Sequence, residues 1–185
     1  MKKFLCSLLA LAVLLISATT LAASKETIPS NADLTAVKRL AVALPMHYKT
    51  ATDEPTVAEL TQIMFDASKS TRFYVISYDE IAANIQRETG VDIKALSDLE
   101  ARKIFAANIA RYADAFVTVT TINSDDDVQL YFEVQNAANG EFLYVLTSKG
   151  GIGKNSADYL KACENFYSKF NSAVEKQLKA ARKKK

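Results

Sequence analysis

The chain has little cysteine and almost no histidine. Of its 185 residues two are cysteines, Cys6 and Cys163, and His47 is the only histidine. A lone histidine with no cysteine or acid cluster at ligand spacing does not make a zinc site. Nucleophilic catalysis needs an activated serine or cysteine with a base in hydrogen-bond reach, and neither His47 nor Cys163, on an apolar helical stripe, indicates one. We therefore expect no metal, no cofactor and no nucleophilic enzyme.

A hydrophobic run long enough to cross a membrane is also lacking. The run Phe4–Ile16 has about 13 residues, whereas a membrane-spanning helix needs roughly 20. It follows Lys2 and Lys3 and leads into small residues, which is the pattern of a secretory signal peptide over residues 1–23. Cys6 lies inside this run rather than after it, so it is not placed as a lipidated cysteine. We expect a periplasmic or secreted protein with no transmembrane segment in its mature chain.

Charge is nearly balanced but unevenly distributed. The chain has 23 basic and 21 acidic side chains, and its last four residues are all basic: Arg182, Lys183, Lys184 and Lys185. Leaving out these four and the two lysines of the signal peptide, 17 basic residues face 21 acidic ones, so the body is mildly acidic. The tail, residues 181–185, is expected to be solvated and could contact an anionic surface such as lipid head groups or wall polymers. No nucleic-acid partner is expected.

The first half of the mature chain predicts a βαβ unit. Residues 24–36 are polar and indicate a flexible arm, and residues 37–44 are a nearly continuous apolar run typical of a strand buried on both faces. Apolar residues at three- and four-residue steps over 57–67 predict a helix that begins at Glu54-Pro55. Residues 73–77 predict the second strand, which should be parallel to the first with a right-handed crossover.

The second half predicts helices and then an antiparallel meander. A short helix is expected over 79–88, and Ser97-Asp98-Leu99-Glu100 has the form of a capping box that opens another helix. The period then changes to two, which predicts strands over 116–122, 128–134 and 142–147. A last helix, capped by Asn155 or Ser156, should lie against the sheet. The fold expected is a single α/β domain over residues 37–180, in which a mixed five-stranded sheet is packed with about four helices.

Four segments together resemble a group of bacterial envelope domains. They are Arg39–Pro45, Arg72–Ser77, Tyr112-Ala113-Asp114-Ala115-Phe116-Val117 and Asn139-Gly140-Glu141. Over residues 37–150 the pattern is similar to the α/β domain of the curli-secretion protein CsgG, the penicillin-binding-protein activator LpoB and the amino-terminal part of TolB. The resemblance implies the fold, an envelope setting and a non-enzymatic role in docking onto envelope partners. The chain lacks their lipidated cysteine, pore-forming insertion or β-propeller, so no functional residue is carried over.

The loop after the first strand is a candidate ligand site. In open α/β sheets, ligands favour the crevice at the carboxyl ends of the strands. His47, Tyr48 and Lys49 follow that strand and could present donors and an aromatic face to a small solute or wall fragment. An ordinary solvated loop over residues 46–50 is the alternative interpretation.

Two other segments have simpler interpretations. Gly150–Ser156 connects a strand to a helix, but Ser148 and Asn155 stand where a phosphate-binding loop needs glycine and then serine or threonine. Anion binding at that helix start stays open. Asp125-Asp126-Asp127 predicts a solvated hairpin turn, because one tight turn rarely supplies the six to eight oxygens that calcium takes.

The strand faces lead to the main functional hypothesis. Tyr131 and Glu133 share one face of their strand, and Leu143 and Val145 share a face of the next. If no helix covers that side of the sheet, these residues form a patch suited to a partner, and if the last helix covers it the patch disappears. An exposed edge strand could also accept a partner strand.

We therefore expect a non-enzymatic adaptor that binds another envelope protein through a sheet face or edge. One alternative is a periplasmic ligand-binding module that uses loop 46–50. Another is a glycan-active enzyme with paired carboxylates, whose spacing in three dimensions the sequence does not display.

Overall fold

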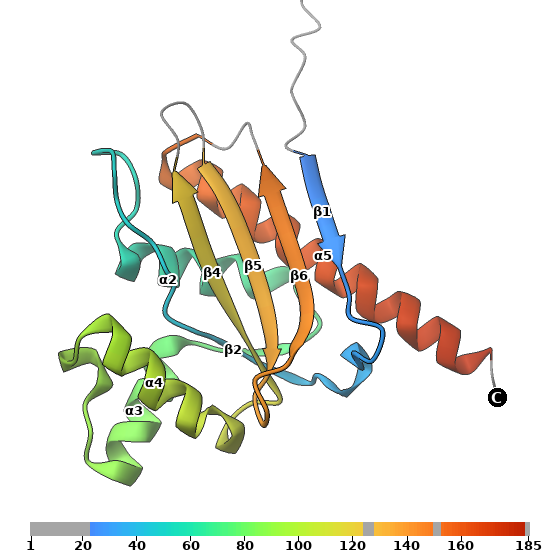
Figure 1. The fold of residues 1–185 in the computed structure, drawn as a ribbon, viewed down its shortest axis with the longest axis horizontal. Helices are drawn as coiled ribbons and strands as arrows, with labels where there is room; N and C mark the ends of the chain where they lie inside the picture. Colours follow the sequence, from blue (N-terminus) through green and yellow to red (C-terminus); the bar gives the residue numbers. More distant parts are fainter. Residues whose placement is uncertain (1–22, 124–127, 150–152, 184–185) are drawn as a thin grey trace, which may run out of the picture.

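Six strands form one mixed sheet at the centre of the structure, a computed structural model that describes residues 23–123, 128–149 and 153–183. The strands are β1 (Ala23–Thr27), β2 (Arg39–Val42), β3 (Tyr74–Ile76), β4 (Ala115–Asn123), β5 (Val128–Asn136) and β6 (Phe142–Lys149). Their order in the sheet is β1-β6-β5-β4-β2-β3. β2 pairs in parallel with both β3 and β4, whereas β4, β5, β6 and β1 pair antiparallel. The mixed α/β sheet, with its parallel unit and its meander, is thus confirmed (Figure 1).

The sheet has six strands rather than the predicted five. The additional strand, β1, comes from the segment 24–36 that was expected to be an arm. A short 3-10 turn, Leu34–Ala36, follows it and is attached to the last helix by Gln177, which accepts from the Leu34 N–H at 2.9 Å and donates to the Ala32 carbonyl at 3.0 Å. β1 is held by main-chain pairing with β6, and its side chains from Ser24 to Thr27 are exposed. Apolar alternation therefore did not reveal it.

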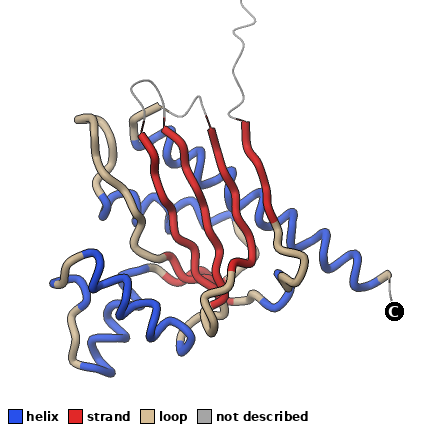
Figure 2. The backbone as a smooth tube through the Cα atoms, viewed as in Figure 1, coloured by secondary structure: helices blue, strands red, loops and turns tan. Residues whose placement is uncertain are grey.

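Helices cover both sides of the sheet, but unequally (Figures 1 and 2). α2 (Val57–Ala67) and α5 (Ser156–Arg182) lie together on one side. α3 (Tyr78–Thr89) and α4 (Asp98–Asn108) lie on the other side, near β2 and β3. None of the helices in the described ranges is both long enough and apolar enough to span a membrane.

Side-chain caps determine where the helices begin. The predicted capping box is present at α4, where Ser97 and Glu100 satisfy each other's backbone N–H groups. A second capping box, between Thr56 and Glu59, starts α2 at Val57. Pro55 therefore precedes the helix instead of occupying its first turn, which corrects the expected start.

The larger core lies between the sheet and α5. Alternate residues of β5 face α5 and are fully buried: Val128, Leu130, Phe132 and Val134. Phe166 of α5 stacks on Phe132 with ring centroids 4.8 Å apart and lies 5.9 Å from Phe170. Cys163 is buried in the same stripe, and burial raises the pKa of its thiol above the ordinary value.

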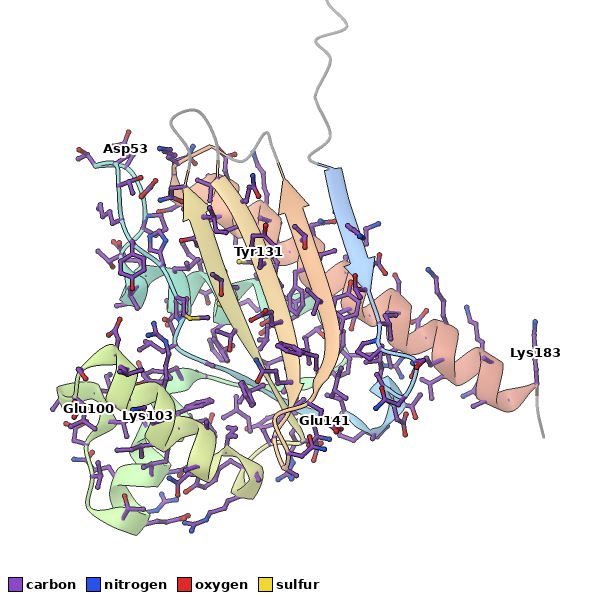
Figure 3. All side chains as sticks on the ribbon, viewed as in Figure 1. Asp53, Glu100, Lys103, Tyr131, Glu141 and Lys183 are labelled. Carbon is purple, nitrogen blue, oxygen red and sulfur yellow. The ribbon has the colours of Figure 1, made fainter. Side chains whose placement is uncertain are left out.

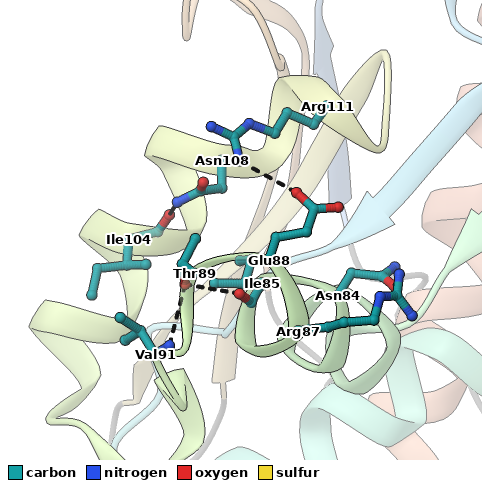
Figure 4. A network of polar contacts seen from close by, with 9 residues as sticks. All are labelled: Asn84, Ile85, Arg87, Glu88, Thr89, Val91, Ile104, Asn108 and Arg111. Atoms are coloured by element: carbon teal, nitrogen blue, oxygen red, sulfur yellow. Dashed lines mark hydrogen bonds and ion pairs between the residues drawn. The ribbon is translucent and has the colours of Figure 1, made fainter.

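A smaller core joins α3 and α4 to the opposite side of the sheet. It contains Ala41 and Ile76 from the parallel strands and Phe105 from α4. Polar contacts hold the far ends of the two helices, as Figure 4 shows: Arg111 pairs with Glu88 at 3.3 Å. This core covers β2, β3 and only the start of β4.

Asp114, in the motif that contributed to the family resemblance, has a structural role. Its Oδ2 accepts hydrogen bonds from the backbone N–H groups of Lys38 at 2.9 Å and Arg39 at 2.8 Å. Burial acts to raise the pKa of Asp114, but these hydrogen bonds outweigh it, and the pKa lies below its ordinary value. The ionised carboxylate thus fixes the start of β2 against β4.

Candidate functional site

Part of the sheet carries no helix on one side. α5 covers the side of β5 that carries Phe132, and α3 and α4 cover the opposite side only as far as Phe116 of β4. Beyond that point the front of β4, β5, β6 and β1 has no described helix against it, and Tyr131 lies on it (Figure 3). We call this region the uncovered face. It consists of Lys25, Thr27, Thr118, Thr120, Ile122, Gln129, Tyr131, Glu133, Val145 and Thr147. Thr118, two residues after Phe116, is only 7% exposed and forms the buried end of this region.

Strand register arranges these side chains in rows across four strands. One row reads Thr118, Glu133, Val145, Thr27, and the next reads Thr120, Tyr131, Thr147, Lys25. Met46 extends the second row, because it forms a parallel bridge with Thr120. Met46 and Ile122 are 39% and 52% exposed. The face therefore combines hydroxyl groups with accessible apolar groups.

Glu133 is the exceptional group on the uncovered face. It is half-buried between Thr118 and Val145, and burial raises the pKa of its carboxyl above the ordinary value. Within the described residues it forms no ion pair and no hydrogen bond through its side chain. The folded protein thus holds an acid in surroundings that disfavour its charge.

Glu54, by contrast, is a buried acid with its own partners. It accepts hydrogen bonds from the Thr50 backbone N–H and hydroxyl, and from the Asn123 amide at 3.1 Å. Burial acts to raise the pKa of Glu54, but the hydrogen bonds from Thr50 and Ala51 outweigh it, and the pKa is lowered. The carboxylate of Glu54 is therefore used in hydrogen bonds that hold the loop around Thr50, just as the carboxylate of Asp114 holds the start of β2.

Three of the four predicted partner-binding residues come together. Tyr131, Glu133 and Val145 lie on the uncovered face, whereas Leu143 is only 7% exposed and packs in the core with α5. Alternation fails at Leu143 because the pairing of β5 and β6 shifts by one residue between Val134 and Gln135.

The three residues of the predicted ligand loop differ in their surroundings. His47 is 4% exposed, with Nε2 2.7 Å from the Pro55 carbonyl oxygen and Nδ1 2.8 Å from the Thr121 hydroxyl. A carbonyl only accepts, so Nε2 carries the proton, and in the neutral ring the Thr121 hydroxyl donates to Nδ1. Tyr48 is 83% exposed and Lys49 is exposed. His47 therefore points inward while its two neighbours face solvent.

The basic residues lie at the end of α5. Arg182 is the last residue of the helix and Lys183 caps it, at the end that reaches past the sheet beyond β1 (Figures 1 and 3). Lys184 and Lys185 lie outside the described residues, as do residues 1–22, Asp125–Asp127 and Gly150–Ile152. Contact of this basic group with an anionic surface stays a prediction.

Comparisons with known proteins identify similar solved structures. No family model matches the chain, and no curated protein matches its sequence. The chain is similar to PelC from Paraburkholderia phytofirmans, described as a dodecamer, at 12% identity and TM-score 0.45, covering 80% of this chain and 96% of that one.

Two further similar structures come from other bacteria. Lipoprotein GNA1162 from Neisseria meningitidis has 13% identity and TM-score 0.41, covering 76% of this chain and 96% of that one. A DUF4136 family protein from Bacteroides thetaiotaomicron has 9% identity and TM-score 0.38, covering 81% and 97%. Similarities with identities and TM-scores this low say nothing about function, which is therefore argued from the residues of this chain.

A cavity that sequence reasoning missed lies at the carboxyl ends of β2 and β3. Its volume is about 420 Å³, and it is bounded by Leu44 after β2 and Ser77 after β3. The cavity lies at the edge of the sheet where the general rule for α/β sheets places ligands, but its lining comes mainly from α2, α3, α4 and the segment before α4 instead of loop 46–50. The sequence signal that could have located this cavity is Ser77, a helix-capping serine directly after a strand.

Glu133→Gln should stabilise the isolated protein at neutral pH. The pKa of Glu133 is higher in the folded protein than in the unfolded chain, so ionisation of this carboxyl lowers the stability as pH rises from the unfolded pKa through the folded one. We expect the variant to melt roughly 1–2 °C higher than the natural protein at pH 7, with the difference vanishing near pH 4. Thermal unfolding across pH measures this. Glu164→Gln, at an exposed position of α5, is the control, and an equal gain there would contradict the assignment.

Proposed function

We propose that the protein is an exported, non-enzymatic adaptor that binds another envelope protein through the uncovered face. The observation that carries this proposal is Glu133. An antiparallel sheet can leave one face in water, so a bare face alone is no interface. A half-buried carboxylate with no partner among the described residues lowers the stability of the free protein. A binding partner that places a positive charge beside Glu133 would offset this loss of stability in the complex.

The size of the uncovered face fits one helix of the partner. Neighbouring strands lie about 4.8 Å apart, so the distance from β4 to β1 is about 14 Å. An α-helix with its side chains is about 10–12 Å across. Such a helix would extend the layer that α3 and α4 begin, with a lysine or arginine toward Glu133 and apolar groups toward Val145 and Ile122.

Other features support an exported adaptor more generally. The pattern of residues 1–23 predicts export, and the resemblance of residues 37–150 implies an envelope setting. No cluster of three or more metal-ligating side chains occurs in the described parts of the chain. The sequestered carboxylates Glu54 and Asp114 are occupied by structural hydrogen bonds. These points favour binding over catalysis.

A site-specific photo-crosslinker tests the proposal. Benzoylphenylalanine at Tyr131 of the full chain, in cells that produce the protein, should yield one dominant covalent adduct with another envelope protein. The same group at Tyr48 and at Leu99, which is 62% exposed on α4, provides matched controls. Adding Glu133→Lys should remove the Tyr131 adduct, because it places like charges together.

Each other outcome argues against the adaptor. An adduct from Tyr48 but not Tyr131 would favour the ligand loop, and equal adducts from all three positions would indicate random collision. A form that ends at Ala181 tests the basic end of α5, and loss of the adduct there would move the interaction to Arg182, Lys183, Lys184 and Lys185.

A further inference from the structure

The 420 Å³ cavity has the position and lining of a ligand pocket. It lies where the chain leaves β2 for α2 on one side of the sheet and leaves β3 for α3 on the other. This change of side at the carboxyl ends of parallel strands is the general location of ligands in open α/β sheets. Pockets for small molecules measure about 300–1,000 Å³, so the volume suffices for a compact ligand.

Its walls combine apolar and polar side chains. Three separate parts of the chain contribute the apolar lining: Leu44, Val57, Ala58, Phe65, Ile93, Leu96 and Ala101. Thr61, Gln62 and Ser77 are the uncharged polar residues of the lining. The Tyr78 ring also lines the cavity, and it is stacked on Phe105 with centroids 5.8 Å apart. Among the described residues the Tyr78 hydroxyl has no hydrogen-bond partner, yet it is not among the fully enclosed polar atoms. It is therefore available to a ligand.

The lining of the cavity carries one more acid than base. Of the three charged lining residues two are acids, Asp79 and Asp98, and the third, Lys94, is paired with Asp79 at 2.8 Å. Arg102 lies 3.6 Å from Asp98 and is directed at the main-chain carbonyls of Leu44 and Pro45. Each of these four charges thus has a partner among the described residues, but Arg102 also donates to the two carbonyls, so Asp98 is the acid whose charge is least compensated.

The helix starts at the cavity do not reverse this balance. α3 and α4 both begin there, and helix amino termini attract anions. Each first turn, however, carries two carboxylates of its own, Asp79 and Glu80 in α3 and Asp98 and Glu100 in α4. Burial is the largest cause of the raised pKa of Tyr78, and the nearby carboxylates of Asp98 and Asp79 add to it.

We propose that this cavity binds a small organic ammonium ligand with an apolar or aromatic body. The body packs against the apolar walls, the ammonium group faces Asp98 and Asp79, and the Tyr78 hydroxyl serves as an additional acceptor. This site is separate from the uncovered face, and its test is independent of the adaptor proposal.

Tryptamine is a suitable probe because the chain contains no tryptophan, so indole fluorescence reports the probe alone. The full mature chain should bind tryptamine saturably, with a blue shift and higher anisotropy. Tryptophol, its neutral analogue, should bind several-fold more weakly. Indole-3-acetate should bind at least about tenfold more weakly, the factor that roughly 1.4 kcal/mol gives. Equal binding of all three, or preference for the acetate, would overturn the assignment of charge.

Single substitutions locate the site. Asp98→Asn should weaken tryptamine about three- to tenfold and leave tryptophol unchanged, whereas Lys94→Gln should strengthen tryptamine. Glu164→Gln, at an exposed position of α5 outside the lining, should have no effect. Ala58→Phe, which places a ring in the cavity from α2, should abolish binding with an unchanged circular dichroism spectrum. Binding that survives Ala58→Phe, or no saturable binding by any of the three probes, would overturn the site.

Discussion

Phe166→Ala should lower the free energy of unfolding by about 3–5 kcal/mol, the range for aromatic residues in closed cores. Phe166 is fully buried and forms the centre of an aromatic cluster. Its ring is stacked on Phe132 at 4.8 Å with an interplanar angle of 7°, and it lies 4.9 Å from Tyr167 and 6.2 Å from Tyr144. Truncation removes these contacts and leaves a cavity that strands and helix fill only partly.

Urea unfolding measures this change, with Phe142→Ala as the matched control. Phe142 is 47% exposed, so the same truncation should cost less than about 1 kcal/mol there. The comparison also bears on function, because the packing of α5 against Phe132 leaves the other side of β5 free. Equal effects of the two substitutions would show that α5 is not packed as described, and the uncovered face would then have no basis.

His47→Ala should lower the free energy of unfolding by about 2–4 kcal/mol. The imidazole joins the Pro55 carbonyl, just before α2, to Thr121 of β4, and it lies edge-on to Tyr159 with centroids 5.7 Å apart. Without it, the Pro55 carbonyl and the Thr121 hydroxyl lose their partner in a buried site. Each unsatisfied buried group costs about 1–3 kcal/mol.

Tyr48→Ala provides the contrast, because its side chain is 83% exposed and its loss should change stability by less than about 0.5 kcal/mol. Chemical denaturation of both variants distinguishes a structural histidine from a ligand residue in an open loop. If His47→Ala were as stable as the natural protein, the buried contacts of the ring would be wrong and the prediction of a ligand site at loop 46–50 would be strengthened.

Local patterns in the sequence were sufficient for most elements. The capping box at Ser97 and Glu100 involves residues three apart, and the alternation from Val128 to Val134 reflects a strand with one buried side. Both signals depend only on near neighbours, which is why they predicted α4 and β5. β1 was missed because main-chain pairing with β6 orders it, and main-chain pairing leaves no side-chain pattern.

The candidate sites depended on contacts between distant residues. His47 precedes Thr121 by 74 positions, and no local pattern distinguishes a histidine that finds such a partner from one that stays in water. Leu143 and Val145 have the spacing of one face, yet a shift in pairing with β5 places Leu143 in the core. The cavity combines Leu44, after β2, with residues of α2, α3 and α4, and its lining spans 57 positions of the sequence, from Leu44 to Ala101.

The sequence by itself determined the helices, the capping box of α4, the parallel unit followed by a meander, and which residues of β5 share a side. Only the tertiary structure decided which side α5 covers, and hence that Glu133 has no described partner on the other. The physical reason is that periodicity assigns residues to the two sides of a strand. What covers each side is decided by the packing of helices that lie far away in the chain.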